Sequence, residues 1–440
     1  MPQSASRPFL WGTSTASYQI EGAVAEDGRT ASIWDTFAHT PHKVERSETG
    51  DTACDHYHRF KEDVALMRDL GVNAYRFSVS WPRILPDGKG KTNSKGVDFY
   101  NRLIDELLAT GITPFATLFH WDLPQSLQDR GGFTKRDIAG WFTDYAVQTA
   151  ERLGDRVKHW IMLNEPSVFA YLGHALGTHA PGIADPNAFF ATTHHLNLAQ
   201  GTALKALRSL DESFELGTTF NVHLAIAADD SEASAQMAQR HNDLWNNSFL
   251  GPLLAGGYPD RVLPDLETFI QPGDLEISSQ KVDFLGINHY FRAHVKANPK
   301  APLGYEQVAP PPELPRTSFG WEINPQHFRD LLLWVHHQYR CPPIYITENG
   351  AYFDDELAAD GKVHDTRRVE FLDRYINAML EARTGGVDIR GYFVWSLLDN
   401  FEWAAGYRPT FGIVKVDFNT LKRTPKDSFY WYQDFVKDHP

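Results

Sequence analysis

The chain has few cysteines, no long apolar run and no excess of basic residues. Cys54 and Cys341 are its only cysteines among 440 residues, so a disulfide-stapled scaffold or a thiolate zinc site is excluded and two reduced thiols are expected. No run of about 18 apolar residues exists that could form a membrane-spanning helix. Acidic residues outnumber basic ones by 56 to 42, and the net charge of −14 argues against non-specific nucleic-acid binding.

Several short motifs are also absent. The segment MPQSASRPFLWG lacks the apolar stretch of a signal peptide, so a cytoplasmic location is expected. Neither GxGxxG nor GxxxxGK[ST] occurs, which disfavours a doubly wound, nucleotide-binding sheet. The pairs His56 and His58, and His194 and His195, lack HExxH spacing and are expected to be surface or helix-packing residues.

A unit of amphipathic helix, glycine and apolar strand recurs along the chain. In its first occurrence, apolar residues follow helical spacing from Phe60, Gly71 stops the helix, and Val72–Trp81 is rich in β-branched and aromatic residues. Later units stop at Gly111 and Gly154 and are followed by similar strands. This alternation predicts parallel βαβ topology.

Eight strands are predicted in total. Eight strands alternating with helices indicate a closed (β/α)8 barrel, and residues 1–440 are expected to form a single domain. The Pro-rich stretch Pro299–Pro315 is predicted to be a long loop on the cleft face, and a final helix is expected in the tail after Thr424. The predicted strands are FLWGTSTAS near residue 9, VNAYRFSVSW near 72, ITPFATLFHW near 112, VKHWIMLNEP near 157, ELGTTFNVHL near 215, VDFLGINHY near 282, PPIYITENG near 342 and GYFVWSLLDN near 391.

Polar and aromatic residues follow the ends of these strands. Because the carboxyl ends of parallel strands meet on one face of a barrel, these residues are expected to converge on one cleft. Glu165 in LNEP ends the fourth strand and Glu348 in ITENG ends the seventh. A glutamate at a strand end is commonly an ion-pair partner or a helix cap. Two carboxylates facing each other across a cleft are instead the arrangement that glycoside hydrolysis requires.

At these residues the sequence strongly resembles glycoside hydrolase family 1, the β-glucosidase family. The matching segments occur in order from Phe9 to Phe418 and cover nearly the whole chain. They are FLWGTSTASYQIEGA, NAYRFSVSWPRILP, FHWDLPQSLQDRGGF, LNEP, LGTHAPG, DFLGINHY, ITENGA and SLLDNFEWAAGYRPTFGIVKVDF.

The resemblance implies a role for each matching residue. Glu165 corresponds to the general acid/base and Glu348 to the nucleophile of a mechanism that retains anomeric configuration, with the two carboxylates about 5 Å apart. The charge of Glu348 would keep Glu165 protonated near neutral pH. Supporting roles are implied for Arg76 and Tyr290 beside the nucleophile, for Asn164 at the sugar 2-hydroxyl, and for Asn288.

The same resemblance implies a sugar-binding set. Gln19 and Glu402 would bind the far end of the sugar ring and close the pocket, which implies exo action. A glutamate at position 402 would repel a 6-phosphate, so a non-phosphorylated sugar is expected. The implied substrate-binding residues are Gln19, His120, Trp121, Asn164, Trp321, Trp395, Glu402, Trp403 and Phe411.

The sequence departs from the family pattern near the cleft entrance. Ser167 stands where the family usually has a tryptophan facing the leaving group. Ala405, Arg408, Pro409 and Thr410 replace a commoner charged pattern. These differences bear on leaving-group and acceptor preference.

The sequence as a whole thus predicts a retaining exo-β-glucosidase. It would act on cellobiose-like oligosaccharides and aryl glucosides, with side activity on galactosides and fucosides, and would use no metal or cofactor. Its expected partner is a small carbohydrate, with no nucleic acid and no membrane, and its oligomeric state is not readable. Two alternatives remain: a transglycosidase of the same fold, and a sugar-binding protein without catalytic activity.

Overall fold

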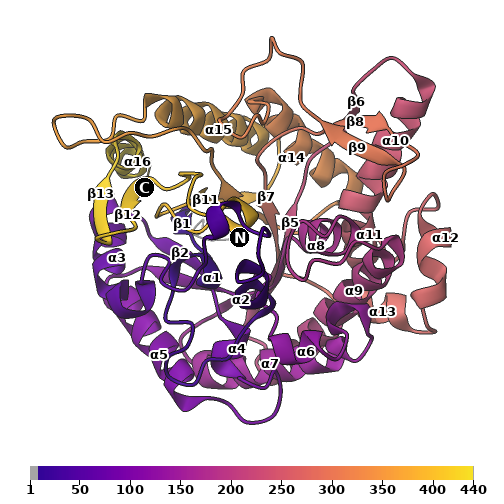
Figure 1. Cartoon of the computed structure of the whole chain (residues 1–440), viewed down its shortest axis with the longest axis horizontal. Helices are drawn as coiled ribbons and strands as arrows, with labels where there is room; N and C mark the ends of the chain where they lie inside the picture. The colour runs from indigo at the N-terminus through magenta and orange to yellow at the C-terminus, as the bar shows by residue number, and fades with distance from the viewer. Residues whose placement is uncertain (1–7, 440) are drawn as a thin grey trace, which may run out of the picture.

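The structure, a computed structural model, describes residues 8–439. Its centre is a closed barrel of eight parallel strands in the order β1-β11-β10-β7-β5-β4-β3-β2 (Figure 1). The eight strands predicted from the sequence all belong to this barrel, so the (β/α)8 fold is confirmed. The barrel strands are β1 (Leu10–Ser14), β2 (Ala74–Ser78), β3 (Thr113–Phe119), β4 (His159–Asn164), β5 (Glu215–Asn221), β7 (Phe284–Asn288), β10 (Ile344–Asn349) and β11 (Ile389–Trp395).

Helices surround the barrel and follow its strands in sequence (Figure 1). Gly71 ends α3 with φ +83°, a left-handed conformation that costs glycine little, and its N–H donates to the carbonyl of Met67. The longer helices are α3 (His56–Leu70), α5 (Ser94–Ala109), α7 (Ile138–Leu153), α9 (Pro186–Leu210), α10 (Glu232–Asn242), α14 (Pro325–Tyr339), α15 (Thr366–Thr384) and α16 (Asp427–Asp438).

Short helices lie mainly in the segments between the longer elements. Within residues 8–439, none of the helices combines the length and apolar character needed to cross a bilayer. The short segments are α1 (Ser17–Ile20), α2 (Ile33–Ala38), η1 (Glu45–Ser47), α4 (Trp81–Ile84), α6 (Gln125–Gln128), η2 (Gly132–Thr134), α8 (Pro166–Ala170), η3 (Tyr171–Ala175), η4 (Asp243–Asn247), α11 (Ser248–Leu254), α12 (Leu263–Leu266), η5 (Glu267–Phe269), α13 (Asp274–Ser278) and η6 (Trp403–Ala405).

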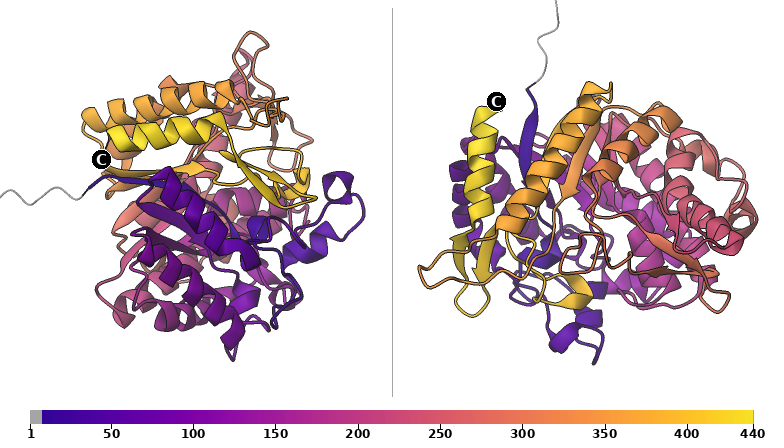
Figure 2. Two further views of the ribbon diagram at one scale, coloured as in Figure 1. Left: turned by 90° about the vertical axis from the view of Figure 1, so that its left-hand side faces the viewer. Right: turned by 90° about the horizontal axis from the view of Figure 1, so that it is seen from above.

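The predicted terminal helix is present as α16. It lies beside α15 on the outside of the barrel (Figure 2). The hydroxyl of Tyr432 donates to the carbonyl of Gly12, so the end of the described chain is hydrogen-bonded to the first barrel strand. The expected absence of a signal peptide rests largely on residues 1–7, which lie outside the described residues.

The Pro-rich segment differs from the predicted loop. Its first part contains β9 (Tyr305–Val308), which pairs with the preceding strand β8 (His294–Ala297) to form a hairpin, and β8 also pairs with β6 (Ile226–Ala227). Within this hairpin Tyr305 is buried, whereas the next two residues, Glu306 and Gln307, are exposed. Only the following residues, up to Pro315, are proline-rich coil. A second small sheet is formed by β12 (Val414–Asp417) and β13 (Lys422–Pro425).

The barrel interior is filled with side chains at one end and open at the other. Near the amino-terminal ends of the strands, a cluster that includes Phe115, Phe284, Tyr345 and Phe393 closes the interior. At the carboxyl-terminal ends, a second cluster includes Tyr290, Trp395 and Phe411. The strand ends therefore present aromatic and polar residues to one face, as the sequence predicted.

Candidate active site

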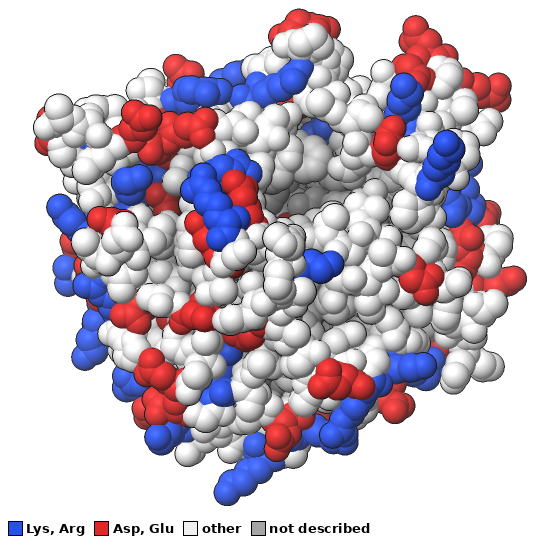
Figure 3. Space-filling model, viewed as in Figure 1, with Lys and Arg blue, Asp and Glu red and all other residues white. Residues whose placement is uncertain are grey.

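A cavity of about 550 Å³ opens at the carboxyl-terminal ends of the barrel strands. It is visible as a hollow in the face shown in Figure 3. Residues from β4, β5, β10 and β11 and from the loops after them converge on it, so the expected cleft exists. Of the sequence-predicted residues, those that line it are His120, Trp121, Glu165, Tyr290, Trp321, Glu348, Trp395, Glu402, Trp403 and Phe411.

Four other predicted residues lie directly behind this lining. Gln19, Arg76, Asn164 and Asn288 are buried, and each is hydrogen-bonded to a residue that lines the cavity. All the predicted site residues are therefore brought to one place, in two layers.

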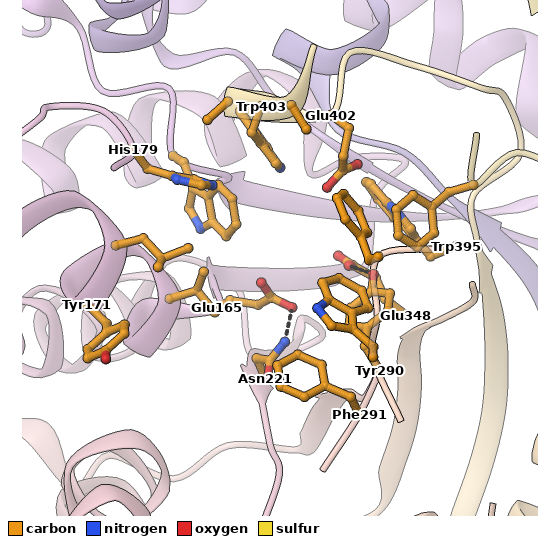
Figure 4. Close-up of a pocket in the computed structure, with 18 of the residues that line it drawn as sticks. Glu165, Tyr171, His179, Asn221, Tyr290, Phe291, Glu348, Trp395, Glu402 and Trp403 are labelled. Atoms are coloured by element: carbon orange, nitrogen blue, oxygen red, sulfur yellow. Dashed lines mark hydrogen bonds between the residues drawn. The ribbon is translucent and has the colours of Figure 1, made fainter. Parts of the chain in front are cut away.

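Glu165 stands between β4 and α8 in a left-handed conformation, φ 47° and ψ 59°. Such strain in a residue other than glycine is typical of functional sites. Its Oε1 accepts hydrogen bonds from the side-chain amide of Asn288 at 2.8 Å and from that of Asn221 at 3.0 Å; Figure 4 shows the bond to Asn221. Burial, and next the charge of Glu348, raise the pKa of Glu165 to about 8, although the two amides oppose this shift. Glu165 is therefore a protonated acid at neutral pH.

Glu348, at the end of β10, has partners of a different kind. Its Oε1 is bonded to the guanidinium of Arg76, and its Oε2 accepts a hydrogen bond of 2.6 Å from the hydroxyl of Tyr290. Burial, together with the charges of Glu348 and Glu165, raises the pKa of Tyr290 well above its usual range, so this hydroxyl stays a donor. Both oxygens of Glu348 are therefore held, one by a cation and the other by a hydroxyl donor.

An amide network connects the two glutamates. The Oδ1 of Asn164 accepts from Arg76 at 2.6 Å and from Asn288 at 3.1 Å, and its Nδ2 donates to Nε2 of His120 at 2.9 Å. Burial lowers the pKa of His120 well below its usual range, so its ring is neutral. With Nε2 accepting, Nδ1 carries the proton, and Nδ1 has no hydrogen-bond partner among the described residues.

Gln19 and Glu402 meet at another part of the cavity wall. The Nε2 of Gln19 donates to Asn400 at 2.9 Å, to the carbonyl of Phe401 at 2.9 Å and to Glu402 at 3.3 Å. Burial, followed by the charges of Glu348 and Glu165, raises the pKa of Glu402 to about 8. Glu402 thus lies close enough to both glutamates to interact with them electrostatically.

Aromatic side chains form the remaining walls. Trp321 stacks between Phe291, with ring centroids 5.0 Å apart, and Phe319, 4.9 Å apart. Trp403 packs against Trp121 with centroids 4.6 Å apart. Flat aromatic faces of this kind suit the C–H faces of a sugar or an aryl group.

Several lining residues were not singled out from the sequence. Asn221 lies in the predicted strand ELGTTFNVHL, where the sequence assigns it no role, and it proves to be a partner of Glu165. The feature of the sequence that could have identified Asn221 is its position at the end of a predicted barrel strand. Ala405 and Arg408, which the sequence marks as departures from the family pattern, also line the cavity. The remaining lining residues, to which the sequence assigns no role, are Glu45, Val168, Tyr171, Leu172, His179, Trp245, Phe291, Gln307, Phe319 and Ala404.

Ser167 does not face the cavity as the family pattern implied. It is buried in α8, and its hydroxyl has no hydrogen-bond partner among the described residues. Its short side chain leaves Val168 and Leu172 to line this wall instead. The cavity wall beside Ser167 is therefore apolar.

The model of glycosyl hydrolase family 1 matches residues 2–440. The chain belongs to this family. It is 48% identical over 436 residues to beta-glucosidase A of Thermotoga maritima, covering 98% of this chain and 97% of that protein. It is 43% identical over 455 residues to a bifunctional beta-D-glucosidase/beta-D-fucosidase of Bifidobacterium breve, covering 98% of each. The family predicted from the sequence is confirmed.

Solved structures of this family resemble the whole described fold. A beta-glucosidase from Thermotoga maritima in complex with glucoimidazole superposes with a TM-score of 0.94 at 47% identity, covering 98% of both chains. A psychrophilic beta-glucosidase from Micrococcus antarcticus gives a TM-score of 0.94 at 44% identity, covering 98% of this chain and 97% of that one. This family 1 barrel holds, in one cavity, a glutamate bonded to two amides and a glutamate bonded to a cation.

Proposed function

We propose that this enzyme is a retaining, exo-acting β-glucosidase in which Glu348 is the nucleophile and Glu165 the acid/base. The observation that carries the proposal is the unequal environment of the two glutamates in one cavity. Glu348 is paired with Arg76, whereas Glu165 is bonded only to neutral amides and has its pKa raised to about 8. β-Glucosidase activity accords with family membership and with the names of full-length relatives.

In the first step, Glu348 attacks the anomeric carbon while Glu165 protonates the departing oxygen. Both amide bonds to Glu165 end on Oε1, which leaves Oε2 without a hydrogen bond to a described residue and able to carry the proton. Attack without an intervening water requires the two carboxylates to be about 5 Å apart. The product is a covalent glycosyl-enzyme and a free alcohol.

In the second step, the roles of Glu165 reverse. Esterification removes the charge of Glu348, which is one cause of the raised pKa of Glu165. Glu165 then becomes a stronger acid and is ionised, so it can accept a proton from the incoming water. Water displaces Glu348, and the glucose released has the configuration of the substrate.

Substrate binding would use the polar atoms that the protein leaves unpaired. Within the described residues, Oε1 of Gln19 and Nδ1 of His120 are buried without a partner, which provides an acceptor and a donor for sugar hydroxyls. Glu402 would bind the far end of the ring. A terminal, non-phosphorylated sugar residue is the ligand that such an arrangement favours, and the aromatic walls would hold the leaving group.

The direct test is the hydrolysis of a nitrophenyl β-glucoside followed by proton NMR. The expected first product is β-glucose, which later mutarotates. Initial release of α-glucose would contradict the retaining mechanism, and absence of turnover would favour the sugar-binding alternative. Product ratios at high acceptor concentration separate hydrolysis from transglycosylation, which uses the same first step.

Two further expectations accompany this proposal. We propose that residues 1–440 form one domain, since the family model matches nearly all of them and α16 is bonded to β1 through Tyr432 and Gly12. The cytoplasmic location stays a prediction.

A further inference from the structure

The turn that follows Glu402 has an unusual backbone. Trp403 has φ +50°, and Gly406 has φ 60° and ψ −138°, a combination that is almost confined to glycine. Within the turn, the N–H of Glu402 donates to the carbonyl of Gly406 at 2.8 Å. The side chains that this turn supplies to the cavity, among them Glu402 and Trp403, therefore depend on a strained conformation that other contacts must hold in place.

Those contacts come from a segment distant in sequence, residues 45–49. Oε2 of Glu48 accepts a hydrogen bond of 2.6 Å from the backbone N–H of Tyr407. The hydroxyl of Tyr407 donates in turn to the carbonyl of Thr49 at 2.7 Å. Arg408 is bonded through Nε to both carboxylate oxygens of Glu45, at 3.0 and 2.8 Å.

The Glu48 carboxylate fits closely against the turn. A Cβ atom added to Gly406 would lie 2.1 Å from Oε2 of Glu48. Because Gly406 has no side chain, it can adopt a positive φ, and the carboxylate of Glu48 can approach it closely. A hydrogen bond from a backbone N–H to an ionised carboxylate is among the stronger kinds in proteins.

We propose that Glu48 is a positioning residue that sets how Glu402 holds the far end of the sugar ring. It touches no substrate and acts through the backbone of Tyr407 on the turn that carries Glu402 and Trp403. The inference rests on the proposed function, in which Glu402 binds the far end of the terminal sugar. Glu48 thereby determines selectivity for sugars with a hydroxymethyl group at this end.

The consequence is a specific pattern in the kinetics. Loss of the Glu48 carboxylate lets the turn relax, and Glu402 loses its fixed position relative to Gln19. The kcat/KM of substrates that bind at the far end of the pocket falls, whereas that of a β-xyloside, which lacks the hydroxymethyl group, is less affected. A merely structural role would lower both activities equally through the amount of folded enzyme.

The experiment compares kcat/KM for nitrophenyl β-glucoside and nitrophenyl β-xyloside in Glu48→Ala, Glu48→Gln and the parent enzyme. The glucoside-to-xyloside ratio is expected to fall about fivefold to tenfold in Glu48→Ala, mainly through KM of the glucoside. Glu48→Gln retains an acceptor oxygen and is expected to restore most of the ratio. A ratio that stays unchanged in Glu48→Ala would overturn the proposal.

Two further variants make the result decisive. Glu402→Ala tests the proposed function on which the inference rests. If Glu402→Ala leaves the glucoside-to-xyloside ratio unchanged, the role of Glu402 is wrong. If Glu402→Ala lowers the ratio strongly and Glu48→Ala does not, only the role of Glu48 is wrong. Glu151→Gln, on the exposed surface of α7, is the matched control. If Glu48→Ala does not fold, Glu48→Asp shortens the side chain and withdraws the carboxylate from the backbone N–H of Tyr407, and an unchanged ratio there also overturns the proposal.

Discussion

Glu165 and Glu348 are the same residue type at equivalent places on one barrel, yet their surroundings differ in charge. Glu348 contacts a guanidinium and a phenol, one at each carboxylate oxygen. Glu165 contacts two neutral amides through one oxygen and is otherwise buried near a negative charge. Chemical role is therefore assigned by neighbours and not by the carboxyl group itself.

The comparison also explains how one cavity keeps an acid and a base at the same pH. Arg76 is the fixed charge that makes the difference, since it is bonded to Glu348 and reaches Glu165 only electrostatically. The following variants test this contrast.

The largest effect is expected for Glu348→Ala. Removal of the nucleophile should lower kcat by about 10⁴-fold or more, because no other group can form the covalent intermediate. Azide or formate should restore part of the activity and give a product of inverted configuration, measured by NMR. Activity within about tenfold of the parent enzyme would contradict the assignment.

Glu165→Ala should show a loss that depends on the leaving group. For an alkyl β-glucoside, which needs protonation, we expect a decrease of about 10²–10⁴-fold in kcat/KM. For a dinitrophenyl β-glucoside, which leaves unaided, kcat/KM should change far less. The measurement is kcat/KM across leaving groups of graded acidity, and equal losses on all of them would remove the distinction between the two glutamates.

Tyr290→Phe tests the second partner of Glu348. It removes one hydrogen bond to a charged acceptor and little volume, so kcat/KM should fall about tenfold to hundredfold. The midpoint temperature of thermal unfolding, measured in parallel, should change little. If the midpoint temperature falls and kcat/KM does not change, Tyr290 has a packing role only.

The smallest effect is a shift of the pH profile in Asn221→Ala. Glu165 must be protonated in the first step, so activity on poor leaving groups should fall as pH rises through about 8. The amide of Asn221 stabilises the ionised form and lowers the pKa of Glu165, so its removal should move this alkaline limb to higher pH, by less than about one unit.

The control for this shift is Asn377→Ala, on the exposed surface of α15. Its pH profile should match that of the parent enzyme. A limb that moves to lower pH in Asn221→Ala would show that Asn221 favours the protonated form instead.

Much of the fold could be predicted because its signals are local. A helical face, a stop such as Gly71 and a β-branched run lie within about 25 residues of sequence, and each unit can be recognised without its neighbours. The hairpin of β8 and β9 was missed because prolines lie in its loop and shortly after β9, and because both strands are only four residues long. Asn221 and Glu48 carry no motif, since their importance depends on partners far along the chain.

The sequence by itself determined the eight strands, the family, and which two glutamates stand at strand ends. Only the tertiary structure decided which oxygen of each glutamate is bonded, that Asn221 contacts Glu165, and that Glu48 supports the turn after Glu402. Arg76 and Glu348 are separated by 272 positions, and Glu48 and Tyr407 by 359. Such contacts form only when the barrel closes in one register, so local patterns in the sequence cannot specify them.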